Sequence, residues 1–170
     1  MRRTLALVLV LAAAAAARAA TFVAPSVEEM ARSSDLVVRG RVLGTAGRAL
    51  PGGRIVTEVE IEVDPDGAWK GAPARTVRLV VPGGRAGRTA MRVDAAPSFS
   101  EGEDVVVFLS RAGPAWRVNG QALGKFRVEG AEVRPAVEGS RLLEKELGPG
   151  ERRVGSMPLA ELERRVRAAR

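Results

Sequence analysis

Hydrophobic and polar residues alternate most regularly in residues 55–63. Branched or threonine side chains occupy every second position, and Val56 and three glutamates occupy the positions between them: Ile55, Thr57, Val59, Ile61 and Val63 against Val56, Glu58, Glu60 and Glu62. Successive side chains of a strand point to opposite faces, so this period of two predicts a half-buried β-strand. We expect the rest of the sheet to be built outward from this strand.

Two neighbouring segments repeat the pattern with basic residues on the outer face. Residues 36–43 and residues 76–81 both alternate, and the arginines beside the inner-facing positions are Arg39, Arg41, Arg75 and Arg78. If the three strands pair as an antiparallel meander, the glutamates lie between these arginines, and opposite charges across strands stabilise the pairing. The pattern therefore predicts a solvent-exposed ladder of ion pairs that sets the register. Residues 44–54 contain Pro51-Gly52-Gly53 and are predicted to form a turn or loop.

A run of five apolar residues, 105–109, predicts a strand that is covered on both faces. Shorter strands are expected at 116–119, 125–129 and 133–137. Pro135 in the last of these cannot donate to a ladder, so it indicates an edge strand. The glycine-rich start of residues 82–97 predicts a long loop. Strands separated by turns, without crossover helices, favour a small barrel or sandwich.

Two helices flank this β-rich region. Ser26 and Glu29 have the spacing of a capping box, which predicts a short helix after Pro25. A second, amphipathic helix is predicted for about residues 156–170, where apolar residues form one stripe: Leu159, Leu162, Val166 and Ala169. A further helical turn is expected at 142–147. The predicted fold class is mainly β, with a short N-terminal helix and a C-terminal amphipathic helix, in a single domain spanning residues 20–170.

The first 19 residues have the pattern of a signal peptide. Basic residues follow Met1, an apolar run extends from Thr4 to Ala16, and Ala17-Arg18-Ala19 fits a small-x-small cleavage site. The apolar run is shorter than the roughly 20 residues that span a bilayer. We therefore expect an exported protein, periplasmic or extracellular, with no stable membrane anchor after cleavage.

The amino-acid composition limits which catalytic groups, metal sites and partners we expect. Cysteine and histidine are absent, which argues against Ser-His-Asp and Cys-His nucleophiles, Cys/His zinc sites and disulfides. Three of the 27 basic residues lie in the signal, so the formal net charge falls from +7 to about +4 after cleavage. With few aromatic residues as well, we expect no nucleic-acid partner. The prediction is a protein that is not an enzyme and has no cofactor, with the oligomeric state left open.

Four residues are candidate binding residues. Arg85 and Arg88 follow Gly83-Gly84, where backbone amides and guanidinium groups suit an anion. The alternative is a plain flexible loop, because no phosphate-loop motif follows. Trp69 and Trp116 are candidate anchors for a peptide or sugar partner. The scarcity of aromatic residues favours the alternative, in which both rings fill the core.

Other polar groups provide weaker candidates. Glu101, Glu103 and Asp104 are the residues of an alternative hypothesis, a carboxylate-dependent hydrolase. Glu101 and Glu103 are, however, expected to share the solvent side of a turn. Residues 64–67 (Asp-Pro-Asp-Gly) are interpreted as a β-turn rather than a calcium loop. Ser98 or Ser100 beside Lys125 lacks the Ser-x-x-Lys spacing of a catalytic pair.

The order of several short motifs resembles a known group of proteins. The motifs are residues 34–42, Trp69-Lys70-Gly71, Pro82-Gly83-Gly84, residues 97–109 and residues 124–128. Over about residues 26–137 the chain resembles exported bacterial proteins of unassigned function and, more distantly, the OB-like barrel of netrin-type and tissue metalloprotease-inhibitor domains. This resemblance implies a barrel and a binding role. The animal inhibitors chelate zinc through an N-terminal cysteine, which this sequence lacks, so their mechanism does not carry over.

These observations predict a non-catalytic binding module for a protein or cell-envelope component, with an inhibitor-like or protease-associated domain as one form of it. The hydrolase and a structural envelope protein are the alternatives.

Overall fold

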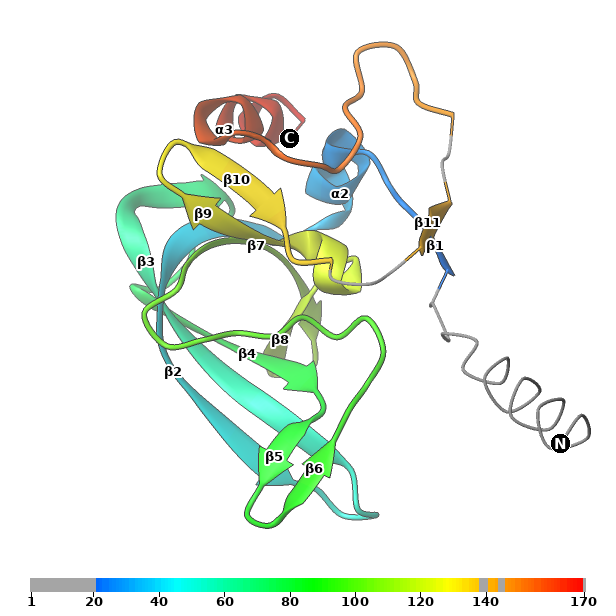
Figure 1. Ribbon diagram of the computed structural model, residues 1–170. Coiled ribbons are helices and arrows are strands. Elements are labelled where there is room, and N and C mark those ends of the chain that lie inside the picture. Colours follow the sequence, from blue (N-terminus) through cyan, green and yellow to red (C-terminus); the bar gives the residue numbers. More distant parts are fainter. Residues whose placement is uncertain (1–20, 138–140, 144–145, 170) are drawn as a thin grey trace, which may run out of the picture.

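The computed structural model describes residues 21–137, 141–143 and 146–169. The fold is mainly β (Figure 1). One sheet contains eight strands: β2 (Leu36–Ala49), β3 (Ile55–Lys70), β4 (Thr76–Pro82), β7 (Asp104–Ala112), β8 (Ala115–Val118), β9 (Lys125–Glu129), β10 (Glu132–Pro135) and β12 (Met157–Pro158). The predicted fold class, mainly β with a short helix near the N-terminus and a C-terminal helix, is confirmed, and the sheet is barrel-like.

The sheet curls until it partly closes. Its order is β12-β10-β9-β7-β2-β3-β4-β8, and β8 also pairs with β7. The contact between β4 and β8 is parallel and consists of one residue pair, Leu79 opposite Trp116. The five strands β7, β2, β3, β4 and β8 therefore form a barrel-like unit, and β9, β10 and β12 continue the sheet beyond it.

The predicted alternation along β3 is confirmed. Val59 and Ile61 are completely buried, and β3 is antiparallel to both β2 and β4. The ion-pair ladder forms on the outer face through three pairs: Arg48–Glu58, Arg78–Glu60 and Arg75–Glu62. Arg39 and Arg41, expected to join it, instead pair with Asp64 and Asp104.

Strand β7 separates two hydrophobic cores, as its unbroken apolar run predicted. Val105, Val107 and Leu109 face the interior of the barrel-like unit. Val106 and Phe108 face the second core, which the helices cover. All five side chains are completely buried, because each face of this strand has its own layer to pack against.

Helix α2 (Val27–Ser33) begins with the predicted capping box, in which the Ser26 hydroxyl accepts from the Glu29 amide. Helix α3 (Leu159–Ala168) buries Leu162 and Val166 in the second core. An Arg165–Glu28 ion pair of 2.7 Å links the two helices. A 3₁₀ helix, η1 (Gln121–Gly124), connects β8 to β9. No helix in the described residues is long and apolar enough to cross a membrane.

Two sequence-based predictions about the first hairpin were wrong. Strand β2 continues through residues 44–49, predicted as loop, because β3 supplies its partners as far as Ala49 opposite Ile55. Residues 64–67 are not a β-turn but a bulge within β3, between the Gly40–Val63 and Val38–Ala68 pairs. A Cβ at Gly67 would collide with the Arg39 carbonyl oxygen, so this bulge needs glycine.

Three further segments differ from expectation. The 82–97 loop contains a hairpin of β5 (Gly84–Ala86) and β6 (Thr89–Met91). Strand β1 (Thr21–Val23) pairs in parallel with β11 (Arg141–Leu143), so residues 142–143 are extended rather than helical. Local pattern did not reveal these pairs because each strand has only three residues. The predicted signal peptide, residues 1–19, lies outside the described residues, as do residues 144–145 of the expected helical turn.

Candidate functional site

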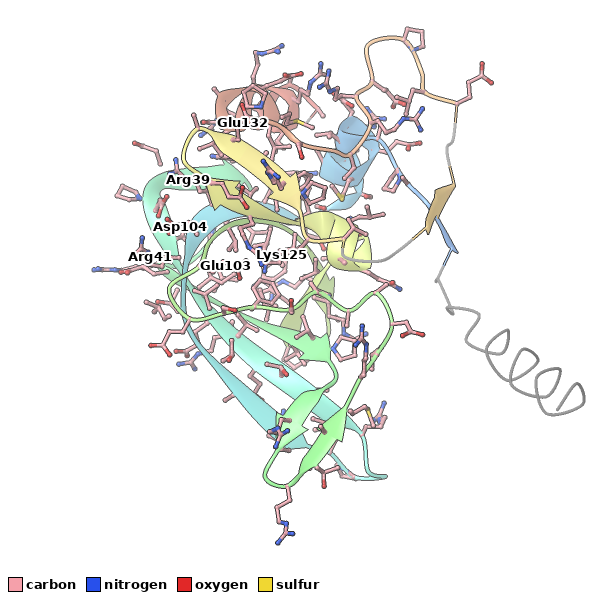
Figure 2. All side chains as sticks on the ribbon, viewed as in Figure 1. Arg39, Arg41, Glu103, Asp104, Lys125 and Glu132 are labelled. Atoms are coloured by element: carbon pink, nitrogen blue, oxygen red, sulfur yellow. The ribbon has the colours of Figure 1, made fainter. Side chains whose placement is uncertain are left out.

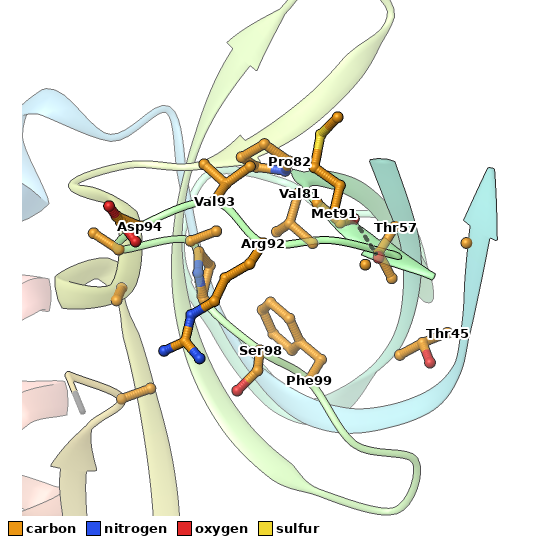
Figure 3. Close-up of a pocket in the computed structure, with 18 of the residues that line it drawn as sticks. Thr45, Thr57, Val81, Pro82, Met91, Arg92, Val93, Asp94, Ser98 and Phe99 are labelled. Atoms are coloured by element: carbon orange, nitrogen blue, oxygen red, sulfur yellow. Dashed lines mark hydrogen bonds between the residues drawn. The ribbon is translucent and has the colours of Figure 1, made fainter. Parts of the chain in front are cut away.

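A cleft of about 700 Å³ opens at the end of the barrel-like unit (Figure 3). Three parts of the chain supply most of its walls, and the lining is completed by Val81, Pro82, Gly83, Ala122, Arg127 and Ala136. The far ends of β2 and β3, here called the arm, contribute Thr45, Gly47 and Thr57. The β5–β6 hairpin contributes Gly84, Arg85 and Met91, and the third wall is the connecting segment 92–99.

The hairpin lies against the arm because glycines allow the two backbones to approach closely. A Cβ at Gly47 would collide with the carbonyl oxygen of Arg85, and a Cβ at Gly84 would collide with the Thr57 hydroxyl. Two hydrogen bonds join the same elements: Thr57 Oγ1 donates to the Gly83 carbonyl at 2.8 Å, and the Gly83 amide donates to the Ile55 carbonyl at 2.8 Å. The orientation of Arg85 at the cleft therefore depends on these two glycines.

The third wall is attached to the elements behind it. The Ala122 amide donates to the Ala95 carbonyl at 3.0 Å. The Lys125 ammonium donates to the Ser98 carbonyl and lies 4.4 Å from the centroid of the Phe99 ring. Phe99 is half-buried and packs against the core inside the barrel-like unit. These contacts hold segment 92–99 in place as a wall of the cleft, although it has no regular secondary structure.

A buried ion cluster supports that wall (Figure 2). The Lys125 side chain has no exposed surface, and that of Glu103 is 8% exposed; their charged groups are 2.7 Å apart. Arg127 Nε donates to the same carboxylate at 2.8 Å. Burial of Glu103 acts to raise its pKa, but the hydrogen bonds from Lys125 and Arg127 outweigh burial and hold the pKa below the ordinary glutamate value.

The cleft is predominantly basic. Arg85, Arg92 and Arg127 line it, together with one carboxylate, Asp94. Arg127 is engaged with Glu103. Arg85 and Arg92 form no ion pair with any of the residues that the structure describes. The chemistry of this lining favours an anionic group, which guanidinium groups can bind through two parallel hydrogen bonds.

The four predicted binding residues are not brought together. Arg85 lines the cleft, and Arg88 lies in the turn of the same hairpin without lining it. Trp69 is 1% exposed and belongs to the core under the helices. Trp116 is half-buried on β8, with the Arg111 guanidinium 4.2 Å from its ring centroid. The core interpretation fits Trp69 and, in part, Trp116, which packs against the core inside the barrel-like unit. Only Arg85 remains at the cleft.

The carboxylates of the hydrolase hypothesis are dispersed. Glu101 is exposed, Glu103 is buried in its ion cluster rather than on the solvent side, and Asp104 pairs with Arg41 at 2.9 Å. None of the three lines the cleft. The hydrogen bond from Lys125 to Ser98 goes to the backbone carbonyl of Ser98. In the described part of the chain, no three carboxylates are placed to hold a metal ion.

Sequence reasoning did not identify Arg92, Arg127 or Phe99 as cleft residues. Arg127 sits on the outer face of a predicted strand, and nothing in its local pattern shows that segment 92–99 returns to it. One signal was available: residues 44–57 and 82–93 together hold five arginines and no carboxylate.

Comparison with protein-family models and with curated proteins returned no match for this chain. Function is therefore inferred from the residues of the cleft.

Proposed function

We propose that this protein is a non-catalytic binding module that holds an acidic segment of a partner protein in the cleft. The observation that carries the proposal is the pair of arginines Arg85 and Arg92, which face the cleft without carboxylate partners among the described residues. A carboxylate of the partner would complete both ion pairs. The export predicted from residues 1–19 makes the partner a periplasmic or extracellular protein.

The walls of the cleft support a polypeptide ligand. Val81, Met91 and Phe99 contribute apolar surface beside the guanidinium groups. Apolar surface with a few placed polar groups is the usual composition of a ligand site. A segment that alternates acidic and apolar side chains matches this surface better than a bare inorganic anion, which would leave the apolar walls uncovered. The distant resemblance to inhibitor-type barrels is consistent with such a role.

The test is direct binding of a fluorescently labelled peptide that alternates glutamate with leucine or valine. Titration of the full mature chain should give saturable anisotropy. Combining Arg85→Ala with Arg92→Ala should weaken binding by about tenfold or more, equivalent to about 1.4 kcal/mol. Arg117→Ala combined with Arg164→Ala is the matched control, because it also removes two positive charges: Arg117 on β8 and Arg164 on α3 are exposed and lie outside the cleft lining.

Two results would overturn the proposal. One is the absence of saturable binding by any acidic peptide at low salt. The other is an equal loss of affinity in the cleft double variant and in Arg117→Ala with Arg164→Ala, which would show that net charge alone attracts the peptide. The circular dichroism and melting temperature of each variant establish that the fold is retained.

A further inference from the structure

The arginine-rich surface continues beyond the cleft to the end of the molecule. The β2–β3 turn is closed by a 2.7 Å hydrogen bond from the Leu50 amide to the Arg54 carbonyl. The neighbouring β5–β6 turn carries Arg88. Both turns lie at the same end of the fold, at the bottom of Figure 1, and Arg54 and Arg88 are both exposed there.

This end differs in charge from the rest of the protein. Residues 44–57 and 82–93 contain Arg48, Arg54, Arg85, Arg88 and Arg92 and no acidic residue. Arg48 pairs with Glu58, and the other four form no ion pair in the described part of the chain. Arginines without an ion pair among the described residues, such as Arg117, occur elsewhere, but Arg54, Arg85 and Arg88 are carried by two hairpins in contact, and Arg92 directly follows the second. Like charges gathered on one surface repel each other, and an anionic partner would relieve that repulsion.

We infer that the partner's segment is extended and longer than the cleft, with acidic residues at every second position along it. Its first carboxylates meet Arg85 and Arg92, and the following ones continue over the hairpin to Arg54 and Arg88. This inference rests on the proposed function, and it adds the length and charge pattern of the partner. An extended chain advances about 3.3 Å per residue, so successive carboxylates on one face recur every second residue.

Two features favour a polypeptide over other polyanions. Arg85 and Arg92 line a concave cleft, which a single chain can enter and a bilayer surface cannot. Binding of single-stranded nucleic acid without sequence preference relies on aromatic rings that stack on bases. The aromatic ring at this cleft, that of Phe99, is half-buried and has the Lys125 ammonium over it.

The experiment compares two acidic peptides, one of about four residues that can occupy the cleft and one of about twelve residues that also reaches the turns. Each is titrated against the wild-type chain, the cleft variant (Arg85→Ala with Arg92→Ala) and the tip variant (Arg54→Ala with Arg88→Ala). We expect the tip variant to bind the short peptide as the wild type does and the long peptide about tenfold more weakly. The cleft variant should bind both more weakly.

Salt dependence provides a second readout. The affinity of the long peptide should fall more steeply with salt than that of the short one, because more charges are in contact, and the tip variant should remove that difference. Arg117→Ala combined with Arg164→Ala controls for the loss of two positive charges. The two tip arginines are exposed, so the variant is expected to keep the wild-type melting temperature.

The outcomes separate this inference from the proposed function. If both peptides bind but the tip variant binds the long one like the wild type, binding is confined to the cleft and the inference is wrong. If neither peptide binds, the proposed function fails. If anionic vesicles or a single-stranded oligonucleotide displace the long peptide and lose affinity in the tip variant, the assignment to a polypeptide is overturned.

Discussion

Ion pairs of the same chemistry occur in two settings in this protein. In the ladder on β3, the side chains of Arg78 and Glu60 are 80% and 41% exposed. In the cluster behind the cleft, those of Lys125 and Glu103 are 0% and 8% exposed. The charged groups of the ladder are solvated in both the unfolded and the folded protein. Folding removes the charges of Lys125 and Glu103 from water, and hydrogen bonds within the cluster replace their hydration.

The difference shows that burial, rather than the number of ion pairs, decides how strongly the stability of this protein depends on a charged residue. Exposed pairs contribute about 0–1 kcal/mol each, so the ladder helps to set register and adds little stability. A buried pair contributes little net stability either, but removing one partner leaves a charge without compensation. The buried cluster therefore makes the position of segment 92–99, and with it the cleft, sensitive to single substitutions.

The largest expected effect is that of Glu103→Ala. The substitution leaves the ammonium of Lys125 buried without its carboxylate, and such losses cost about 3–5 kcal/mol. Urea denaturation should show this decrease in the free energy of unfolding. Combining Glu103→Leu with Lys125→Met removes both charges and should restore most of it. A loss below about 1 kcal/mol for Glu103→Ala would refute the account of the cluster.

Lys125→Met alone is expected to cost less, about 1–3 kcal/mol. Glu103 keeps its hydrogen bond from Arg127, and the partly exposed side chain of Arg127 can follow the carboxylate. The Ser98 carbonyl loses its donor, so the same variant should also weaken peptide binding to the cleft. Unfolding and anisotropy measurements on one preparation test both effects. An unchanged peptide affinity would show that Lys125 does not position the wall.

Protonation of Glu103 in acid should lower the free energy of unfolding, by less than Glu103→Ala does. The pKa of Glu103 in the folded protein lies below the ordinary value, which is about 4.3 in the unfolded chain. The unfolded state therefore binds more protons between these two values. The contribution is complete above the ordinary pKa and is lost as pH falls toward the lowered one. Between pH 6 and pH 3 the melting temperature of Glu103→Gln should fall less than that of the wild type. Parallel plots of melting temperature against pH for the two proteins would contradict this.

The smallest effect is expected in the ladder. Arg78→Ala should cost less than about 1 kcal/mol, and even this should shrink at high salt, because exposed charges are screened. Unfolding at low and at high salt provides the measurement. A loss comparable to that of Glu103→Ala would show that exposure does not separate the two settings, and the comparison would fail.

The amino-acid sequence determined the elements whose pattern is local. Alternation in residues 55–63, the apolar run in residues 105–109 and the stripe along the last helix predicted the inner faces correctly. The capping box at Ser26 was equally readable. These predictions succeeded because strand and helix periodicity place side chains on faces whatever the rest of the chain does.

The tertiary structure alone decided the parts that depend on distant partners. Residues 44–49 lack apolar alternation, and they form a strand because β3 offers backbone groups to pair with. In the sequence, Lys125 cannot be distinguished from any other basic strand residue. Its role follows from its contacts with Glu103 and Ser98, which the fold brings to it from an earlier part of the chain. The five arginines at one end were visible in the sequence. That two of them face a common cleft depends on the close approach of Gly47 to Arg85, because long-range contacts have no signature in local pattern.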